Sequence, residues 1–251
     1  MDMKKLTAFA LAVAAAGALA CSGNNAKYDV TGANAPEDGA VVYLMDQLTS
    51  APIDSAVVAD GAFQMKGKAA KDAFLELTTD GFDWNFLFFN DGTPVVMDYA
   101  EKTVTGSDLN NRLTECDKAN TDAYAVYNQL IEDFEALPEE EREARMEEFV
   151  PQYRAALDKY REFYLNMIEE NKDNLVPVAF IQQVRSMAGP DKFEELLNSG
   201  APFASHPYVL DLKRKIDESM ARQKEAEEKK QAIIGQKFLD LEEADPDGNM
   251  H

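Results

Sequence analysis

The residue with the clearest capacity for covalent chemistry is Cys21, which lies at the end of an export-type signal. Lys4 and Lys5 form a basic start, and the stretch from Leu6 to Leu19 consists only of apolar and small residues. That stretch is too short to span a bilayer, which takes about 20 residues. A basic start, a short apolar stretch and small residues before a cut are typical of a secretory signal peptide. We therefore expect residues 1–20 to be removed.

The junction itself leaves two outcomes open. Ala18-Leu19-Ala20 has the small residues of an ordinary signal-peptide cut. A small residue followed by Cys also resembles the lipobox of bacterial lipoproteins, in which the cysteine thiol receives a diacylglycerol. The usual lipobox has Leu where this chain has Ala18, but both interpretations place Cys21 at the new N-terminus. We expect Cys21 to carry a lipid, with residues 21–27 as a flexible tether.

The second cysteine, Cys116, is predicted to be structural. It has no Cys-x-x-Cys partner and no neighbouring histidine, so nothing in the sequence marks its thiol as redox-active. A small, half-buried apolar residue near a helix start is the simpler interpretation. Two cysteines in the whole chain also cannot form a disulfide framework.

An aromatic cluster surrounds one predicted strand. Phe82, Trp84 and Phe86 alternate along the chain, and Phe88 and Phe89 follow them. Alternate side chains of a strand point to the same face of a sheet. The cluster is therefore either hydrophobic core with one aromatic residue at an edge, which is the commoner arrangement, or a ligand groove. A groove lined by Phe82, Trp84 and Phe86 would suit a peptide or a glycan.

The acidic and histidine side chains form no catalytic or metal-binding pattern. The densest acidic cluster, Glu139-Glu140-Glu141 and the residues after it, would suit a cation or a basic partner, but a solvated helix N-terminus explains it more simply. Residues 245–249 lack the spacing and the distal Glu of a calcium loop. His206 precedes Pro207 and is predicted to be a capping or surface residue rather than a base. The sequence contains no nucleotide-binding motif and no hydrolase motif. We therefore expect no cofactor and no metal, and no motif supports a hydrolase.

The charge and composition exclude several classes of partner. The chain has 46 Asp and Glu against 25 Lys and Arg, a net charge of −21. Binding to nucleic acid relies on Lys and Arg that neutralise phosphates, and an anionic membrane surface would repel this chain. Two histidines are too few for most transition-metal sites. Because 10% of the residues are aromatic, the chain is a folded acidic protein rather than a disordered one.

The elements that must position these residues change character at Gly106. From Tyr28 to Thr105, short apolar or alternating runs are separated by turn-forming pairs, of which Asp60-Gly61 is a strong hairpin signal. Seven or eight short strands at this spacing predict an antiparallel sandwich or barrel over residues 28–106. The lack of a long crossover segment argues against a parallel sheet.

Residues 107–232 are predicted to be helical. A three–four spacing of apolar residues from Met146 to Met167 predicts a long amphipathic helix, which Pro151 would kink or restart. Shorter helices follow, with breaks at Gly189-Pro190 and His206-Pro207. Beyond Met220 the last helix loses its apolar face, which is typical of an exposed, connecting helix.

The order of these features resembles a known family. The β-part contains Ile53-Asp54-Ser55-Ala56-Val57-Val58-Ala59-Asp60-Gly61-Ala62-Phe63, and a helical segment follows Gly106-Ser107-Asp108-Leu109-Asn110. After a lipoprotein signal, this order resembles the N-terminal half of the TlpA/ResA-like thiol–disulfide oxidoreductase lipoproteins of gut Bacteroidetes. In those proteins a β-domain of unknown function (DUF4369 type) precedes a helical spacer and a thioredoxin-like domain. The residues from Ile234 through Asn249 resemble the opening strand and turn of that last domain.

The resemblance transfers only one residue. The family's Trp-Cys-x-x-Cys motif, whose first cysteine is the nucleophilic thiolate, has no counterpart in this sequence. No catalytic residue can therefore be assigned from the family, and only Cys21 corresponds, as the lipid-bearing position. The resemblance implies that residues 233–251 are the start of a truncated thioredoxin-like domain or a tail.

We expect an α+β chain, with an antiparallel β-domain followed by an all-helical segment. The resemblance implies an exported, lipid-anchored and non-catalytic module that recognises or positions a partner for a TlpA/ResA-like oxidoreductase. The lipid on Cys21 would hold it in the cell envelope, at the periplasmic or outer-membrane face, near an envelope protein partner. The alternative is a free-standing lipoprotein that binds a peptide or a glycan in the groove at Phe82, Trp84 and Phe86.

Overall fold

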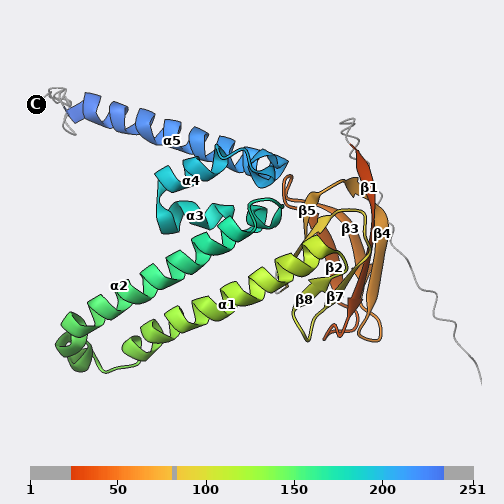
Figure 1. The fold of residues 1–251 in the computed structure, drawn as a ribbon, viewed down its shortest axis with the longest axis horizontal. Coiled ribbons are helices and arrows are strands. Elements are labelled where there is room, and N and C mark those ends of the chain that lie inside the picture. Colours follow the sequence, from red (N-terminus) through yellow and green to blue (C-terminus); the bar gives the residue numbers. More distant parts are fainter. Residues whose placement is uncertain (1–23, 81–83, 235–251) are drawn as a thin grey trace, which may run out of the picture. The chain divides into compact units, whose positions relative to one another are not determined.

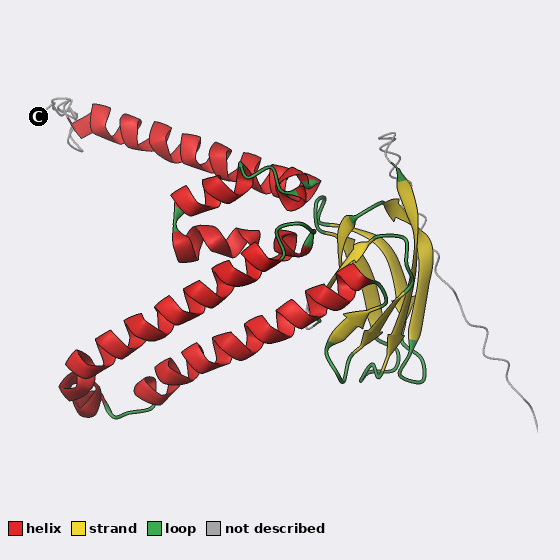
Figure 2. Cartoon of the chain, in the orientation of Figure 1, coloured by secondary structure: helices red, strands yellow, loops and turns green. Residues whose placement is uncertain are grey.

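The computed structural model describes residues 24–80 and 84–234, with side chains up to residue 231, and it confirms the α+β class. β-strands come first and helices follow (Figure 1, Figure 2). The signal peptide, Cys21, Phe82 and residues 235–251 lie outside the described residues. The strands are β1 (Asn25–Ala33), β2 (Val41–Asp46), β3 (Ala51–Val57), β4 (Phe63–Ala70), β5 (Ala73–Thr79), β6 (Phe86–Asn90), β7 (Val95–Asp98) and β8 (Thr103–Thr105).

The strands form two four-stranded sheets, in the orders β4-β1-β7-β8 and β3-β2-β5-β6. Most neighbouring strands are antiparallel, as predicted, but β1 pairs in parallel with β7, with Val30 opposite Val95. The sequence argument was made against a parallel sheet and did not anticipate this one parallel pair. It considered only a single crossover segment, whereas the strands from β2 to β6 together form the connection that a parallel pair requires.

The predicted turn at Asp60-Gly61 is present and joins the two sheets. Both residues have positive φ, 52° and 69°, as a two-residue type I′ turn requires. Ala59 and Ala62 exchange backbone hydrogen bonds of 2.9 and 3.0 Å across the turn. The strands that follow then separate, because β3 belongs to one sheet and β4 to the other. The turn is therefore a corner between the sheets rather than the end of a long hairpin.

One hydrophobic core lies within this β-part, and further buried apolar side chains belong to the helices. Alternate residues of the strands are buried in the core of the β-part, among them Val30, Leu44, Leu75 and Met97. Two aromatic rings lie over glycines of the paired strand: Phe63 opposite Gly32, and Tyr28 opposite Gly67. The Tyr28 hydroxyl also donates a hydrogen bond of 2.8 Å to the Asp54 carboxylate, which ties β1 to β3.

The helical elements follow the predicted breaks. They are α1 (Asp108–Glu135), α2 (Glu139–Glu170), the 3₁₀ helix η1 (Val176–Ala179), α3 (Ile181–Ala188), α4 (Pro190–Leu197), the 3₁₀ helix η2 (Pro202–Ser205) and α5 (Pro207–Ile234). Ser107 caps α1, since its hydroxyl accepts the backbone N–H of Asn110 at 3.2 Å. Helix α2 begins at Glu139 and continues through Pro151, so the restart considered at that proline does not occur.

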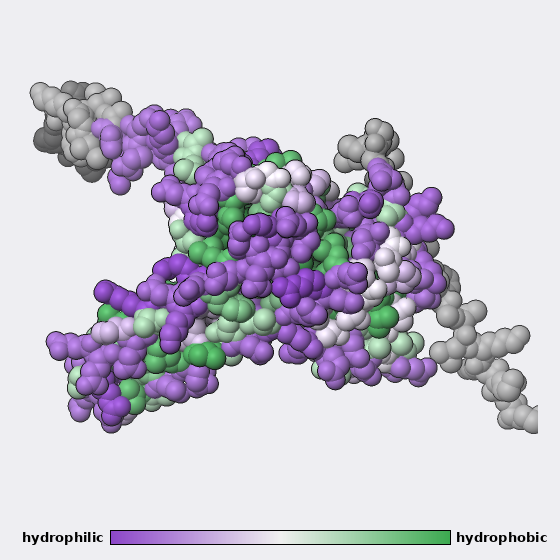
Figure 3. All heavy atoms as spheres, viewed as in Figure 1, coloured by the Kyte–Doolittle hydropathy of each residue, from purple (hydrophilic) through white to green (hydrophobic). Residues whose placement is uncertain are grey.

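Helices α1 and α2 lie side by side as an antiparallel hairpin (Figure 1). Aromatic pairs hold them together: the rings of Phe134 and Phe149 stack at 3.8 Å, and those of Tyr127 and Tyr160 at 5.8 Å. Figure 3 shows hydrophobic residues gathered along this hairpin among hydrophilic ones. None of the helices in the described residues is both long and apolar enough to cross a bilayer.

The chain divides into two compact units, residues 1–209 and residues 210–251. The first unit contains both sheets, α1 to α4 and the start of α5. The second contains the rest of α5, in which Met220 and the described side chains after it are exposed. This exposure confirms the prediction of a polar helix beyond Met220.

Candidate functional site: an aromatic cavity beside two strand edges

The first turns of α1 cover an edge of β6 with a side-chain amide. The Asn110 side-chain oxygen accepts the backbone N–H of Phe89 at 2.8 Å, and its nitrogen donates to the Phe89 carbonyl at 3.0 Å. Asn110 is 1% exposed and Phe89 is fully buried. The amide of Asn110 therefore occupies the place that the peptide group of a neighbouring strand would take.

One turn later on the same helix face, Thr114 covers an edge of β8. Its hydroxyl accepts the backbone N–H of Val104 at 3.2 Å and donates to the Val104 carbonyl at 2.7 Å. Residues four apart on a helix lie on the same side. Asn110 and Thr114 together form what we call the strand-edge seal, which joins α1 to the last strand of each sheet.

A cavity of about 430 Å³ opens next to this seal. Its size lies within the range of small-ligand pockets, roughly 300–1,000 Å³. Buried and half-buried apolar side chains line it together with polar ones, most of which are exposed. The apolar residues are Trp84, Phe86, Leu87, Tyr99, Val104, Leu113, Ala179 and Phe180, and the polar ones are Asn85, Lys102, Thr114, Asp117, Asn120 and Gln183.

The aromatic part of the cavity is a packed group of three rings. The Trp84 and Tyr99 ring centroids are 4.9 Å apart, and Phe86 meets Trp84 edge-on at 6.3 Å. Trp84 is only 5% exposed and belongs to the hydrophobic core, yet it also lines the cavity. The core and groove interpretations of the aromatic cluster therefore each describe part of its surroundings.

Of the three residues predicted to form a groove, the structure brings Trp84 and Phe86 together, while Phe82 lies outside the described residues. Sequence reasoning missed Tyr99 and Phe180 as cavity residues. Tyr99 follows β7, and Phe180 follows η1, so neither belongs to the alternating pattern around β6. No local signal in the sequence could have joined them to Trp84.

The charged groups of the cavity are Asp117 and Lys102. Asp117 reaches solvent at the rim, yet the protein atoms around its carboxyl remove water and raise its pKa above the ordinary value. Lys102 lies in the turn before β8, with a φ of 52°. Asn120 also lines the cavity, and it is held in place because its side-chain oxygen accepts the Tyr160 hydroxyl at 2.9 Å.

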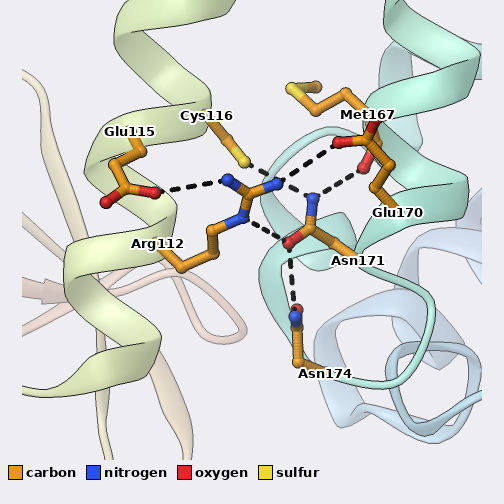
Figure 4. Close-up of polar contacts among 7 residues, drawn as sticks. All are labelled: Arg112, Glu115, Cys116, Met167, Glu170, Asn171 and Asn174. Carbon is orange, nitrogen blue, oxygen red and sulfur yellow. Dashed lines mark hydrogen bonds and ion pairs between the residues drawn. The ribbon is translucent and has the colours of Figure 1, made fainter.

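A cluster around Arg112 joins α1, whose residues line one wall of the cavity, to the end of α2 (Figure 4). The Arg112 Nε donates to the Asn171 side-chain oxygen at 2.9 Å, and its terminal nitrogens pair with Glu115 at 3.2 Å and Glu170 at 3.4 Å. Asn171 also donates to the carbonyl of Met167 at 2.7 Å. These bonds tie the start of α1 to the end of α2, a few residues before η1.

Cys116 lies inside this cluster near the start of α1, as predicted, but it is buried rather than half-buried. Its residue is 3% exposed, and its sulfur is 3.5 Å from the Asn171 side-chain nitrogen. Burial raises the pKa of the Cys116 thiol, and the smaller, opposite effects of Arg112 and Asn171 do not reverse that shift. A buried thiol with a raised pKa is a poor nucleophile.

His206 caps the start of α5. Its Nδ1 accepts the backbone N–H of Tyr208 at 3.2 Å, and its Nε2 lies 2.9 Å from the Asp72 carbonyl, to which it donates in that tautomer. The capping prediction is confirmed, but the surface position is wrong, because His206 is only 7% exposed. Burial against β5 and its turn lowers the pKa of His206.

The densest acidic cluster lies at a helix start, and residues 245–249 are outside the described residues. Glu139, Glu140 and Glu141 occupy the first turn of α2, as the helix-start interpretation predicted. Within residues 24–80 and 84–234, no group of three or more His, Cys, Asp or Glu side chains is placed to hold a metal ion.

Residues 28–113 match the family model described as a domain of unknown function, DUF4369. The match begins in β1 and ends at Leu113 in α1, so it includes Trp84, Phe86 and Asn110. The N-terminal part of the resemblance is thereby supported. Searches among curated proteins and among solved structures found no match to this chain.

Proposed function

We propose that this chain is a non-catalytic recognition module that binds a peptide or a glycan in the aromatic cavity at Trp84 and Phe86. The observation that carries this proposal is the cavity itself: about 430 Å³, with packed aromatic rings and exposed polar groups around them. Pockets that hold small ligands combine apolar walls with a few polar groups that fix orientation. Aromatic rings supply much contact area with little loss of conformational freedom.

The described side chains favour binding over catalysis. The Cys116 thiol is buried, and both ring nitrogens of His206 have hydrogen-bond partners. Asp117 and Lys102 are the charged residues that line the cavity, and the lining includes no histidine, no cysteine and no second carboxylate. Metal-assisted hydrolysis needs several such ligands around one metal ion.

A second role is compatible with the first, and the DUF4369 match favours it. The chain would be the lipid-anchored recognition and positioning module of a TlpA/ResA-like thiol–disulfide oxidoreductase from Bacteroidetes. The lipid on Cys21 would place it in the cell envelope. Labelled fatty acid should enter the wild-type protein and not a Cys21→Ser variant, and thiol–disulfide exchange by this chain should be absent. A reading frame that continues past codon 251 into Trp-Cys-x-x-Cys would support the oxidoreductase; exchange activity abolished by Cys116→Ser would refute this role.

Intrinsic fluorescence tests the cavity directly, because Trp84 is the only tryptophan of the chain. Tryptophan-free peptides and soluble oligosaccharides are titrated against the protein while Trp84 emission is recorded. A ligand in the cavity should shift or quench this emission, and Tyr99→Ala should weaken binding. Tyr124→Ala is the matched control, since Tyr124 lies on α1 outside the cavity and is 47% exposed. If neither class of ligand changes the emission, the proposal is wrong.

A further inference from the structure

The β6 strand has an open edge beside the cavity. It is the last strand of its sheet, with β5 on one side only. In an antiparallel ladder, residues alternately direct their N–H and C=O toward the neighbouring strand and away from it. The backbone N–H and C=O of Phe89 both bind the Asn110 side chain, so they point away from β5. Phe74 lies opposite Phe89 in β5, and its carbonyl accepts the Gln47 N–H at 3.1 Å on the β2 side. The Phe74 carbonyl therefore also points away from β6, as this alternation requires.

The same alternation places the N–H and C=O of Leu87 on that open edge. Leu87 is two residues before Phe89 in β6, and it lines the cavity. The strand-edge seal reaches Phe89 and Val104 but not Leu87. Among the described residues, no strand and no side chain pairs with Leu87 on this side. Folded proteins usually cover such edges, because an open edge recruits another strand.

Asn110 shows which chemical group fits this edge. A side-chain amide has the same donor and acceptor as a peptide group, and it binds both backbone groups of Phe89 at 2.8 and 3.0 Å. An extended peptide carries such groups along its length, and its side chains alternate between two faces. We propose that the ligand of the cavity is an extended peptide that pairs with the Leu87 backbone and so adds a strand to β6. This inference rests on the proposed function of the cavity.

The cavity also indicates which peptide would bind. One apolar side chain of the added strand would contact Trp84, Phe86 and Tyr99, which supply apolar contact area. Asp117 and Lys102 give the cavity one charge of each sign, so the preference for basic residues comes from the net charge of −21 of the whole chain. A glycan has no donor–acceptor pairs at the spacing of a strand, so it would use the polar rim rather than the Leu87 edge.

The probe is a phage-displayed library of random seven-residue peptides, selected on the whole chain. Selected sequences without tryptophan are synthesised, and their affinity is measured by Trp84 emission. Each is then remade with a single N-methyl group on one backbone amide at a time. Strand pairing predicts an alternating result: methylation of an amide that faces Leu87 should weaken binding about tenfold, and methylation of the next amide should not.

The protein side of the test uses Leu87→Pro with Leu87→Ala as the matched control. Proline removes the N–H, and it is tolerated at an edge strand when that N–H faces away from the ladder. Leu87→Pro should bind selected peptides about tenfold more weakly than Leu87→Ala, since only the proline variant loses the donor. If Leu87→Pro does not fold, the N-methyl scan decides alone.

Three results would overturn the inference but not the proposed function. The first is equal affinity of all N-methylated peptides, and the second is equal peptide affinity of folded Leu87→Pro and Leu87→Ala. The third is that the selection enriches no peptide while oligosaccharides shift Trp84 emission. That result would leave the proposed function intact and assign the cavity to glycans. If neither ligand class changes the emission, both the inference and the proposed function fail.

Discussion

Replacing Asn110 with alanine should destabilise the fold much more than replacing the adjacent Asn111. Asn110→Ala leaves the Phe89 N–H without a partner, while the Phe89 carbonyl keeps only the Asp91 N–H at 3.1 Å, and Phe89 is fully buried. An unpaired buried N–H costs about 1–3 kcal/mol and the lost bond to the carbonyl about 0.5–1.5 kcal/mol, so the sum is roughly 1.5–4.5 kcal/mol. Asn111 accepts one N–H, that of Gly106 at 3.0 Å, in an exposed place where water can replace it. Its loss should cost about 1 kcal/mol or less. Both changes are Asn→Ala in the first turn of one helix, so their helix propensities cancel.

Urea unfolding measures this difference, with Trp84 emission as the signal and the free energy of unfolding extrapolated to water. Domains are stable by only about 5–15 kcal/mol, so the expected loss for Asn110→Ala is a large fraction of the total. Asn110→Asp adds a second test, because it keeps an acceptor for the Phe89 N–H but sets a carboxylate against the Phe89 carbonyl. It should be no more stable than Asn110→Ala. If Asn110→Ala and Asn111→Ala differ by less than about 1 kcal/mol, water or backbone movement replaces the amide, and the strand-edge seal is not the stabilising contact described above.

Three further predictions concern single residues. Cys116 should react with a thiol reagent at pH 7 only after denaturation, because it is 3% exposed and burial raises its pKa; rapid reaction in the native protein would contradict this. Gly67→Ala should cost about 1–3 kcal/mol in urea unfolding, since the new Cβ would overlap the Tyr28 hydroxyl, which must then move. His206 should make stability depend on pH: its folded pKa lies below the unfolded value of about 6.5, so its contribution is complete above that value and is lost as the pH falls through the folded pKa. Asp46 and Asp72 oppose this shift without reversing it, and His206→Gln should remove the dependence.

The elements whose signals are local were predictable from the sequence. The Asp60-Gly61 turn requires positive φ at both positions, and these two residue types tolerate it. The breaks at Gly189-Pro190 and His206-Pro207 likewise mark helix starts, because proline fits the first position of a helix. A helix was also predicted from Met146 to Met167, where apolar residues recur at three and four positions, and it is part of α2. Each of these signals lies within a few residues of the feature that it predicts.

The features that were missed depend on contacts between distant residues. The parallel pair of β1 and β7 joins Val30 to Val95, with five other strands between them. His206 is buried because its ring reaches the Asp72 carbonyl, 134 residues earlier in the chain. The cavity unites Trp84, Tyr99 and Phe180, which belong to three different parts of the sequence. Periodicity identifies the face of an element that is apolar, but it contains no information on which distant residue will meet that face.

The contacts of α1 show that the change from strand-like to helical sequence at Gly106 is not the end of the β-domain. The alternating pattern of the strands ends there, yet the edges of β6 and β8 are completed by Asn110 and Thr114, which lie beyond it. The DUF4369 match extends through Leu113 and therefore includes Asn110. A polar side chain that binds both backbone groups of a buried strand residue stabilises that strand as a neighbouring strand would. The first turn of α1 thus contributes to the stability of the β-domain. Its side chains cover β6 at Phe89 but not at Leu87, whose backbone lies at the cavity.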